Sequence, residues 1–429
     1  MFDPSEGLSF PENYEACVRP IVNVWVKHAI VLAGASFGTK VISALFPGGR
    51  HIISAILGLG TLYYFFDRLL LYILAHVLVS FILLRYLMRS NSKRNAHLFT
   101  VISVLFLIVG EFSVKATYWQ KLRGPLMLIA MKTISLVYDY NSLSLKSLPS
   151  FTSYLGYMLT SGSCVFGPWI SFKDYWNSFE VTSLSRQLGE KVLEKSLLSL
   201  VFLIFSTCWL DWLVPAPWHP WIRLYQRALT IRFSHYFVSY YSEATNLLVG
   251  TPIESGIVSP LEVELPYSLM QVVKHWNAPM HRWLKQYVFR VSLEYGAFFS
   301  VLTTYLVSAS LHGLNFRLAG ILVSLGFYSY VEYVFRKKLS VAFNACISAK
   351  PCSKFCEKHD HTEREIAVKF FNTLFMLVNI FHLIYLGILL DFNSETQQHN
   401  SWDTFREWYE LDFISHGVAS GMFIFQLFV

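Results

Sequence analysis

The stretch VLTTYLVSASLHGLNF, residues 301–316, decides the class of fold. It contains no Asp, Glu, Lys or Arg, and its ionisable side chains are those of Tyr305 and His312. An uncharged apolar run is typical of a helix that crosses a bilayer, where charged side chains are costly. An ionisable residue in such a helix marks a pathway or a chemical site, unless neighbouring helices simply satisfy its ring nitrogens. His312 is therefore the first candidate functional residue.

The rest of the chain has the same membrane character. Of its 429 residues, 54% are hydrophobic, 17% are aromatic and 15% are charged. Soluble domains contain about 25% charged residues. The apolar runs are continuous rather than alternating, which indicates helices rather than a β-barrel. We predict an all-α multi-pass membrane protein with about ten to twelve transmembrane helices.

The expected spans lie near residues 21–46, 51–88 (two spans), 98–114, 124–140, 151–171, 193–214, 228–249, 291–311, 313–334, 366–390 and 412–429. No internal repeat or low-complexity tract divides the chain. We expect a polar N-terminal segment over residues 1–20 and one membrane domain over 21–429, with a catalytic region at about 250–340. The N-terminal segment lacks the features of a cleavable signal, so an early span is expected to target the chain to the membrane.

Charge patterning suggests an orientation for the catalytic region. The net charge of +7 requires no nucleic-acid partner, because basic residues gather at Arg85–Arg94 and Arg336–Lys338, as in cytoplasmic membrane loops. The interval 250–290 is basic and aromatic in its second half, and four prolines disfavour one uninterrupted helix there: Pro252, Pro260, Pro266 and Pro279. If residues 274–290 also face the cytosol, the next two spans cross outward and back. His312, with Gly313 suited to a tight turn beside it, then lies toward the lumenal side.

Six cysteines are present, and their distribution indicates no disulfide framework. Cys17, Cys164 and Cys208 are scattered. A polar connection carries a cluster of five residues: Cys346, Cys352, Cys356, His359 and His361. Cys and His are the usual zinc ligands, but the spacing C-x5-C-x3-C-x2-H-x-H matches no strong zinc pattern. Reduced or lipid-modified cytosolic thiols are therefore favoured, zinc is the alternative, and no metal is predicted.

Two adjacent segments resemble a known family. HWNAPMHRWLKQYVFR (275–290) precedes TYLVSASLHGLNFRLAGILVSLGFYSYVEYVFRKKL (304–339). The membrane-bound O-acyltransferases are marked by an Asn or Asp in a loop and, some tens of residues later, a His in an apolar span. Asn277 and His312 have that spacing. The segments 129–141 (IAMKTISLVYDYN), 154–172 (YLGYMLTSGSCVFGPWISF) and 233–250 (FSHYFVSYYSEATNLLVG) resemble the family members that acylate Wnt proteins.

The resemblance implies a helical bundle that encloses a through-membrane tunnel. It implies transfer of a monounsaturated palmitoleoyl group from acyl-CoA to a serine of a secreted Wnt protein in the endoplasmic reticulum, with no cofactor. His312 is then the general base, a role that suits an imidazole with an ordinary pKa of about 6.5. Asn277 then orients or stabilises the acyl carbonyl, with capping of a helix as the alternative.

Further candidates complete this expected site. Trp276, Tyr305, Ser308 and Leu311 match positions that line the tunnel or approach the acyl chain in the family. Tyr305, Ser308 and His312 share one face of a helix. By charge and position alone, Lys274, His275, Arg282 and Lys285 could bind the CoA phosphates, or they could anchor an interfacial helix.

Two other functions remain open on sequence grounds. One is a family acyltransferase that acts on a lysophospholipid, a sterol or another secreted protein, because the Asn–His pair does not separate acceptors. The other is a multi-pass transporter that uses His312 as a proton relay, although transporters often carry inverted repeats and none is visible here.

Overall fold

The computed structural model describes residues 9–90, 92–142, 144–180, 185–214, 219–251, 256–312, 316–353, 356–390 and 405–428. Helices are the regular structure in these ranges, and the extended residues Ala345 and His361 form one isolated bridge. The predicted all-α class is confirmed. The chain forms two compact units. Unit 1 holds Met1–Pro215, Arg232–Ile257 and Ser310–Leu314, and unit 2 holds Ala216–Ile231, Val258–Ala309 and Asn315–Val429.

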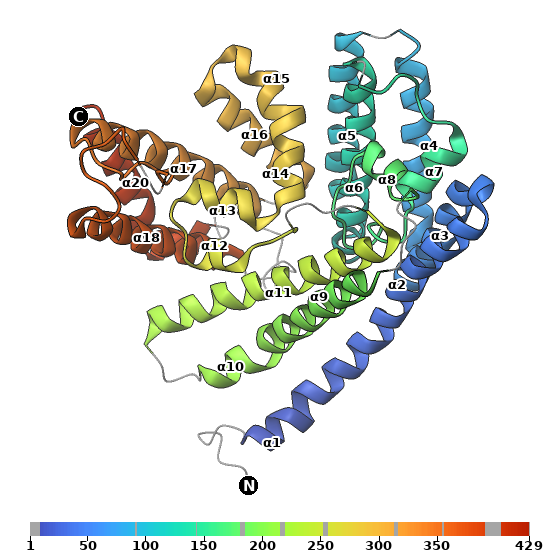
Figure 1. Ribbon diagram of the computed structural model, residues 1–429, viewed down its shortest axis with the longest axis horizontal. Coiled ribbons are helices and arrows are strands. Elements are labelled where there is room, and N and C mark those ends of the chain that lie inside the picture. Colours follow the sequence, from blue (N-terminus) through green and yellow to red (C-terminus); the bar gives the residue numbers. More distant parts are fainter. Residues whose placement is uncertain are drawn as a thin grey trace. The chain divides into compact units, whose positions relative to one another are not determined.

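Unit 1 is built mainly from long helices (Figure 1). In order they are α1 (Phe10–Asn13), α2 (Arg19–Leu45), α3 (Arg50–Phe66), α4 (Leu70–Leu87), α5 (Lys93–Ser113), α6 (Ala116–Asn141), α7 (Phe151–Met158), α8 (Phe172–Asn177), α9 (Arg186–Ile204), α10 (Leu210–Leu213) and most of α11 (Pro220–Val249). A π-helical turn joins α1 to α2, so one helical segment runs from Phe10 to Leu45. Helix α3 packs on α2 and α7, and α6 packs on α4 and α5.

A disulfide in unit 1 corrects the expectation of unlinked cysteines. Cys17, in the turn before α2, is bonded to Cys208, in the π-helical turn between α9 and α10. The two cysteines are 191 residues apart in sequence, so no local spacing pattern could reveal the pair. The bond ties the N-terminal helix to the end of α9.

Unit 2 contains two long helices, α17 and α18, among shorter ones. They are α12 (Pro260–Glu264), α13 (Leu269–Trp276), α14 (Ala278–Leu284), α15 (Arg290–Ser292), α16 (Ala297–Leu311, whose last two residues belong to unit 1), α17 (Phe316–Ala342), α18 (Ile366–Gly387), α19 (Arg406–Glu410) and α20 (Ile414–Phe425). The prolines interrupt the 250–290 interval as expected: Pro260 begins α12, Pro266 separates α12 from α13, and Pro279 lies in the first turn of α14. Pro252 lies outside the described residues.

Two sequence predictions fail in unit 2. The span expected over 291–311 is interrupted at Gly296, whose φ of 102° an L side chain rarely adopts, and α16 begins only after it. The basic group Arg336–Lys338 was expected in a connecting loop but lies inside α17, where Arg336 is fully buried.

Fewer helices qualify as membrane spans than the ten to twelve expected. Among the described residues, six segments are long and apolar enough: Phe10–Leu45, Pro47–Leu87, Lys93–Ser113, Arg186–Leu213, Phe316–Ala342 and Ile366–Gly387. One of these contains both α3 and α4. Helices α6 and α11 are long but carry internal charges such as Lys132 and Arg232, which lower their hydropathy. Helices α16 and α20 are apolar but short.

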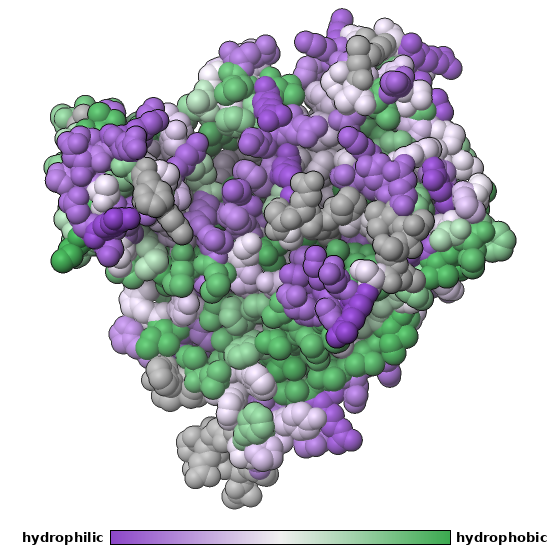
Figure 2. All heavy atoms as spheres, in the orientation of Figure 1, coloured by the Kyte–Doolittle hydropathy of each residue, from purple (hydrophilic) through white to green (hydrophobic). Residues whose placement is uncertain are grey.

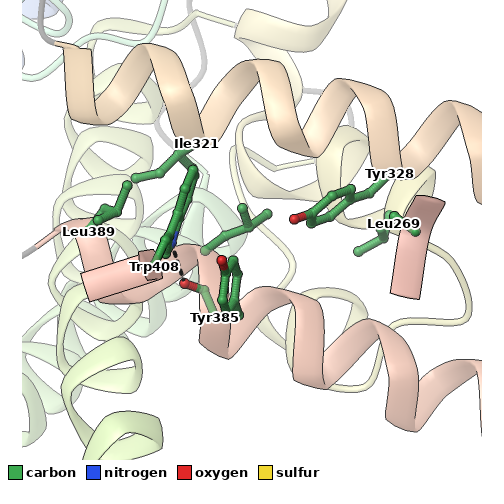
Figure 3. Close-up of a cluster of buried hydrophobic side chains, with 8 residues drawn as sticks. Leu269, Ile321, Tyr328, Tyr385, Leu389 and Trp408 are labelled. Carbon is green, nitrogen blue, oxygen red and sulfur yellow. Dashed lines mark hydrogen bonds between the residues drawn. The ribbon is translucent and has the colours of Figure 1, made fainter. Parts of the chain in front are cut away.

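The core of unit 2 joins its long helices to α13 (Figure 3). The buried cluster contains Leu269 of α13, Ile321 and Tyr328 of α17, Tyr385 of α18 and Trp408 of α19. The indole Nε1 of Trp408 donates a hydrogen bond to the Tyr385 carbonyl at 3.1 Å, which satisfies the polar atom of a buried ring. The start of α13 is therefore held by the same core as α17 and α18.

The outward faces of several helices are apolar. Leu193, Leu197 and Val201 on α9 expose 46–60% of their surface. Figure 2 shows hydrophobic side chains gathered over this region. A contiguous exposed apolar surface of this kind suits contact with lipid.

Candidate functional site

Asn277 lies at the junction of α13 and α14. Its side-chain oxygen accepts a hydrogen bond from the backbone N–H of Met280 at 3.1 Å, so it is the N-cap of α14. This bond explains why α14 begins here, with Pro279 in the first turn where a missing N–H costs little. The capping interpretation is thus confirmed. The bond uses only the oxygen, so the carboxamide NH2 can still donate to another group.

His312 directly follows the last residue of α16. Leu311 is fully buried and His312 is half-buried, and both belong to unit 1. Asn277 belongs to unit 2. Gly313, which was expected to form a tight turn, lies outside the described residues.

Tyr305 and Ser308 lie one turn apart on α16. The Tyr305 hydroxyl lies 3.4 Å from Ser329 Oγ on α17, and its ring packs on Gly326. A Cβ at residue 326 would lie 2.6 Å from Tyr305 Cδ2, so this contact requires glycine. Ser308 is buried. α17 therefore holds one of the expected tunnel-lining side chains in a defined position.

Lys274, His275 and Arg282 lie on the two helices that meet at Asn277, and Lys285 lies in the π-helical turn directly after α14. Lys274, Arg282 and Lys285 are exposed, whereas Trp276 and His275 are half-buried. Burial lowers the pKa of His275, and neighbouring Lys274 lowers it further. His275 is therefore mainly uncharged at neutral pH and attracts phosphate less than the three exposed cations.

Three further segments carry the family resemblance, residues 129–141, 154–172 and 233–250, and hydrogen bonds join them inside unit 1. Lys132 of α6 is fully buried and donates to the Tyr157 carbonyl at 2.8 Å and to Ser163 Oγ at 3.1 Å. On α11, Thr245 and Asn246 donate to the Gly162 carbonyl at 2.9 and 2.6 Å.

These bonds explain why the span expected over 151–171 is wrong. Helix α7 ends at Met158, and irregular backbone follows. Inside a membrane protein such backbone is tolerated only where its polar groups are satisfied by other parts of the protein. Lys132 and α11 supply those partners.

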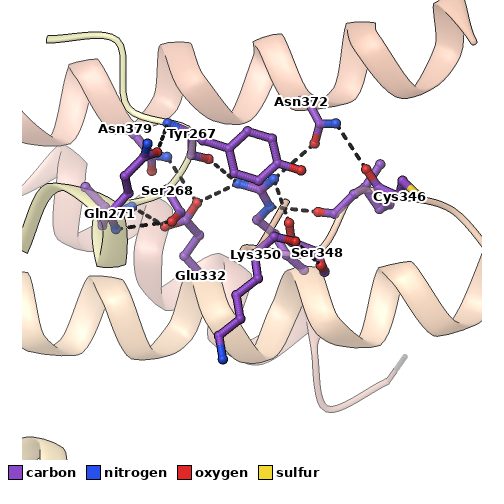
Figure 4. A network of polar contacts seen from close by, with 12 residues as sticks. Tyr267, Ser268, Gln271, Glu332, Cys346, Ser348, Lys350, Asn372 and Asn379 are labelled. Atoms are coloured by element: carbon purple, nitrogen blue, oxygen red, sulfur yellow. Dashed lines mark hydrogen bonds and ion pairs between the residues drawn. The ribbon is translucent and has the colours of Figure 1, made fainter. Parts of the chain in front are cut away.

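A buried ion pair in unit 2 was not anticipated from the sequence (Figure 4). Arg336 pairs with Glu332, one turn earlier on α17, at 2.9 Å. Arg336 also donates to the Tyr267 carbonyl at 2.6 Å, and Glu332 accepts from the Leu269 N–H at 2.8 Å. The pair therefore holds the start of α13, the helix that ends at Asn277. A Glu and an Arg four residues apart in an apolar helix are the signal that could have revealed it.

The structure gathers most of the predicted cysteine and histidine cluster. Cys346, Cys352, Cys356 and His359 converge, with one ligand atom from each within 4.8 Å of the others. His361 does not join them. Its Nδ1 lies 2.9 Å from the Glu365 carboxylate instead, and both side chains are exposed.

Comparison with known proteins identifies relatives along the whole chain. The family described as MBOAT, membrane-bound O-acyltransferase, matches residues 59–356, which include Asn277 and His312. Proteins named protein-serine O-palmitoleoyltransferase porcupine are 35% identical in Mus musculus and 34% identical in Homo sapiens, each over 97% of both chains. The protein of that name from Anopheles gambiae is 31% identical over 98% of this chain and 94% of its own.

Proposed function

The chain belongs to the membrane-bound O-acyltransferase family, and we propose that it transfers a palmitoleoyl group from acyl-CoA to a serine hydroxyl of a secreted Wnt protein in the endoplasmic reticulum membrane. The observation that carries this proposal is similarity over 97% of both chains to enzymes named for that acyl group and for serine. Enzymes that share only the family and act on other acceptors would not be expected to match over the full length.

In the proposed reaction His312 is the general base. Its neutral imidazole removes the proton of the acceptor serine as the serine oxygen attacks the thioester carbonyl of the acyl-CoA. The new C–O bond forms and the C–S bond breaks. The imidazolium returns its proton to the departing CoA thiolate. No cofactor and no covalent acyl-enzyme is required.

Asn277 has two roles in this proposal. Its side-chain oxygen caps α14 through the bond to Met280. Its NH2 group stabilises the negative charge that develops on the acyl carbonyl oxygen, or orients that carbonyl. Lys274, Arg282 and Lys285 attract the CoA phosphates, and Trp276, Tyr305, Ser308 and Leu311 contact the acyl chain.

The acceptor can be tested with the wild-type chain purified in detergent. Palmitoleoyl-CoA is supplied with a disulfide-bonded Wnt hairpin that carries the acceptor serine, with the same hairpin carrying alanine, or with a lysophospholipid. We expect mass spectrometry to detect acylation of the serine hairpin only. Preferential acylation of the lysophospholipid would contradict the proposed acceptor and favour the other branch of the family.

A further inference from the structure

The polar connection between α17 and α18 brings three thiols and one imidazole to a common point. His359 Nδ1 lies 3.6 Å from Cys346 Sγ, 3.6 Å from Cys352 Sγ and 3.3 Å from Cys356 Sγ. The three thiols are free rather than disulfide-bonded. One ring nitrogen therefore faces three sulfur atoms at once, which exceeds what a single N–H or lone pair can bond.

These distances fit the edges of a tetrahedral metal site. With Zn–S of about 2.3 Å and Zn–N of about 2.05 Å, sulfur and nitrogen ligands lie about 3.6 Å apart around zinc. The separations to Cys346 and Cys352 equal that edge, and the separation to Cys356, 3.3 Å, is slightly shorter. Three sulfurs and one imidazole also form a closed set of four ligands, which is typical of structural rather than catalytic zinc.

A second contact orients the imidazole for this role. Ser340 Oγ donates its proton to the Ala345 carbonyl at 2.6 Å and lies 3.1 Å from His359 Nε2. Since the serine proton is already used, Nε2 carries the proton and donates to Ser340 Oγ, which leaves the Nδ1 lone pair directed at the three sulfurs. A hydrogen bond that fixes the ring of a ligating histidine in this way is a regular feature of protein metal sites.

The backbone closes the loop around the same point. The N–H of Cys346 donates to the His361 carbonyl at 2.9 Å, and the His361 N–H donates to the Asn344 carbonyl at 3.1 Å. Cys346 is fully buried, so this fold leaves no room for lipid attachment at its sulfur. The zinc alternative thus accounts for the cluster better than lipid-modified thiols do.

We propose that Cys346, Cys352, Cys356 and His359 bind one structural Zn²⁺ ion. The thiolates are the soft ligands that select zinc in a tetrahedral site, and binding displaces their protons. His361 lies outside the set, because its side chain is exposed and pairs with Glu365.

The ion has a defined structural task. Arg336 donates to the carbonyls of Ile347 and Ser348 at 2.8 and 3.1 Å, directly after the ligand Cys346. The same guanidinium bonds the Tyr267 carbonyl just before α13. By fixing the loop, zinc fixes the carbonyls that hold Arg336, and through Arg336 it braces α13, the helix that ends at Asn277.

The metal content of the purified full-length chain tests this assignment. Elemental analysis should find about one zinc per wild-type chain. Zinc should be lost in Cys352→Ala and His359→Ala but retained in His361→Ala, the matched histidine two residues away, and in Cys164→Ser, a free cysteine of unit 1. Absence of stoichiometric zinc from wild type, a different metal in its place, or equal loss in His361→Ala would overturn the assignment.

A measurement on wild type alone covers the possibility that the ligand variants do not fold. Removing zinc with a strong chelator should lower the thermal midpoint and speed amide hydrogen exchange in α13, while α9 in unit 1 stays unchanged. Added zinc should reverse both effects. An unchanged midpoint and unchanged exchange in metal-free protein would refute the bracing role. Neither measurement depends on transferase activity.

Discussion

At the scale of single residues, Asn277 serves a helix and, in the proposed reaction, a substrate. The two roles use different atoms of the side chain. The oxygen accepts a hydrogen bond from the Met280 N–H, and the NH2 group donates to the acyl carbonyl in the proposed reaction. Asn277→Ser keeps a good N-cap but removes the carboxamide. We expect near-normal thermal stability and a loss of about 10²–10³-fold in kcat, as for removal of one oxyanion donor.

Two variants separate the cap from the chemistry. Asn277→Ala should add a stability loss of about 1 kcal/mol to the same loss of rate. Ser185→Ala removes another helix N-cap, that of α9, and should cost stability without loss of kcat. If Asn277→Ser retained full activity, Asn277 would be a cap and nothing more.

Gly326 tests the placement of Tyr305. In Gly326→Ala the new Cβ would lie 2.6 Å from the Tyr305 ring, so the ring or α16 must move. Overpacking of this kind typically costs about 1–3 kcal/mol, and we expect a lower thermal midpoint together with a higher KM for acyl-CoA. Gly189→Ala is the matched control, because its Cβ would meet nothing within 4 Å on α9. Equal behaviour of the two variants would argue against the α16–α17 contact.

At the scale of elements, the buried pair Glu332–Arg336 of α17 also connects to α13 through the Leu269 N–H and to α18 through Asn372 and Asn379. Arg336→Met leaves the Glu332 charge without its cation and should cost about 3–5 kcal/mol of stability. The double variant Glu332→Gln, Arg336→Met should recover part of that loss, because no buried charge remains. Thermal unfolding in detergent measures both.

The exposed pair Arg406–Glu410 provides the comparison for this prediction. It has the same spacing of four residues and nearly the same length, 2.9 Å, but its side chains are 71% and 58% exposed. Arg406→Met should therefore change stability by less than about 1 kcal/mol. A loss as large as that of Arg336→Met would mean that burial does not set the cost.

The elements differ in how far local sequence determines them. Helices such as α5, α9 and α18 could be predicted because each is a continuous apolar run long enough to cross a membrane. The end of α7 could not, because it depends on Lys132 and on α11, which lie far away along the chain. The convergence of the thiol cluster could not be predicted from the spacing of its cysteines for a similar reason. The loop that carries it is held by Ser340 and Arg336, which belong to α17 rather than to the loop.

At the scale of the whole molecule, the cysteines of the described residues occur in two states, a disulfide and free thiols. Cys17 and Cys208 are joined in unit 1, and disulfides persist in oxidising compartments. We expect a non-reducing digest to contain the linked peptides of these two residues. Cys17→Ser, Cys208→Ser should lower the thermal midpoint, whereas Cys164→Ser should leave the link intact. Alkylation of both cysteines without prior reduction would contradict the bond.

The site was predictable only in part, for physical reasons. His312 could be selected from the sequence because ionisable residues are rare in apolar spans, whereas Asn277 was selected through the family resemblance. The bonds from Arg336 to the Tyr267 carbonyl and from the Leu269 N–H to Glu332 join segments that lie far apart along the chain. Hydropathy and spacing carry no information about such contacts.

The central claim is that His312 acts as the base in acyl transfer to serine. The most direct test compares wild type, His312→Ala and the exposed-histidine control His97→Gln. The three are purified in detergent with matched thermal midpoints and given palmitoleoyl-CoA and the Wnt serine hairpin. Wild type and His97→Gln should acylate the hairpin, and His312→Ala should bind acyl-CoA but transfer none detectable by mass spectrometry. Equal transfer by His312→Ala and wild type would contradict the account.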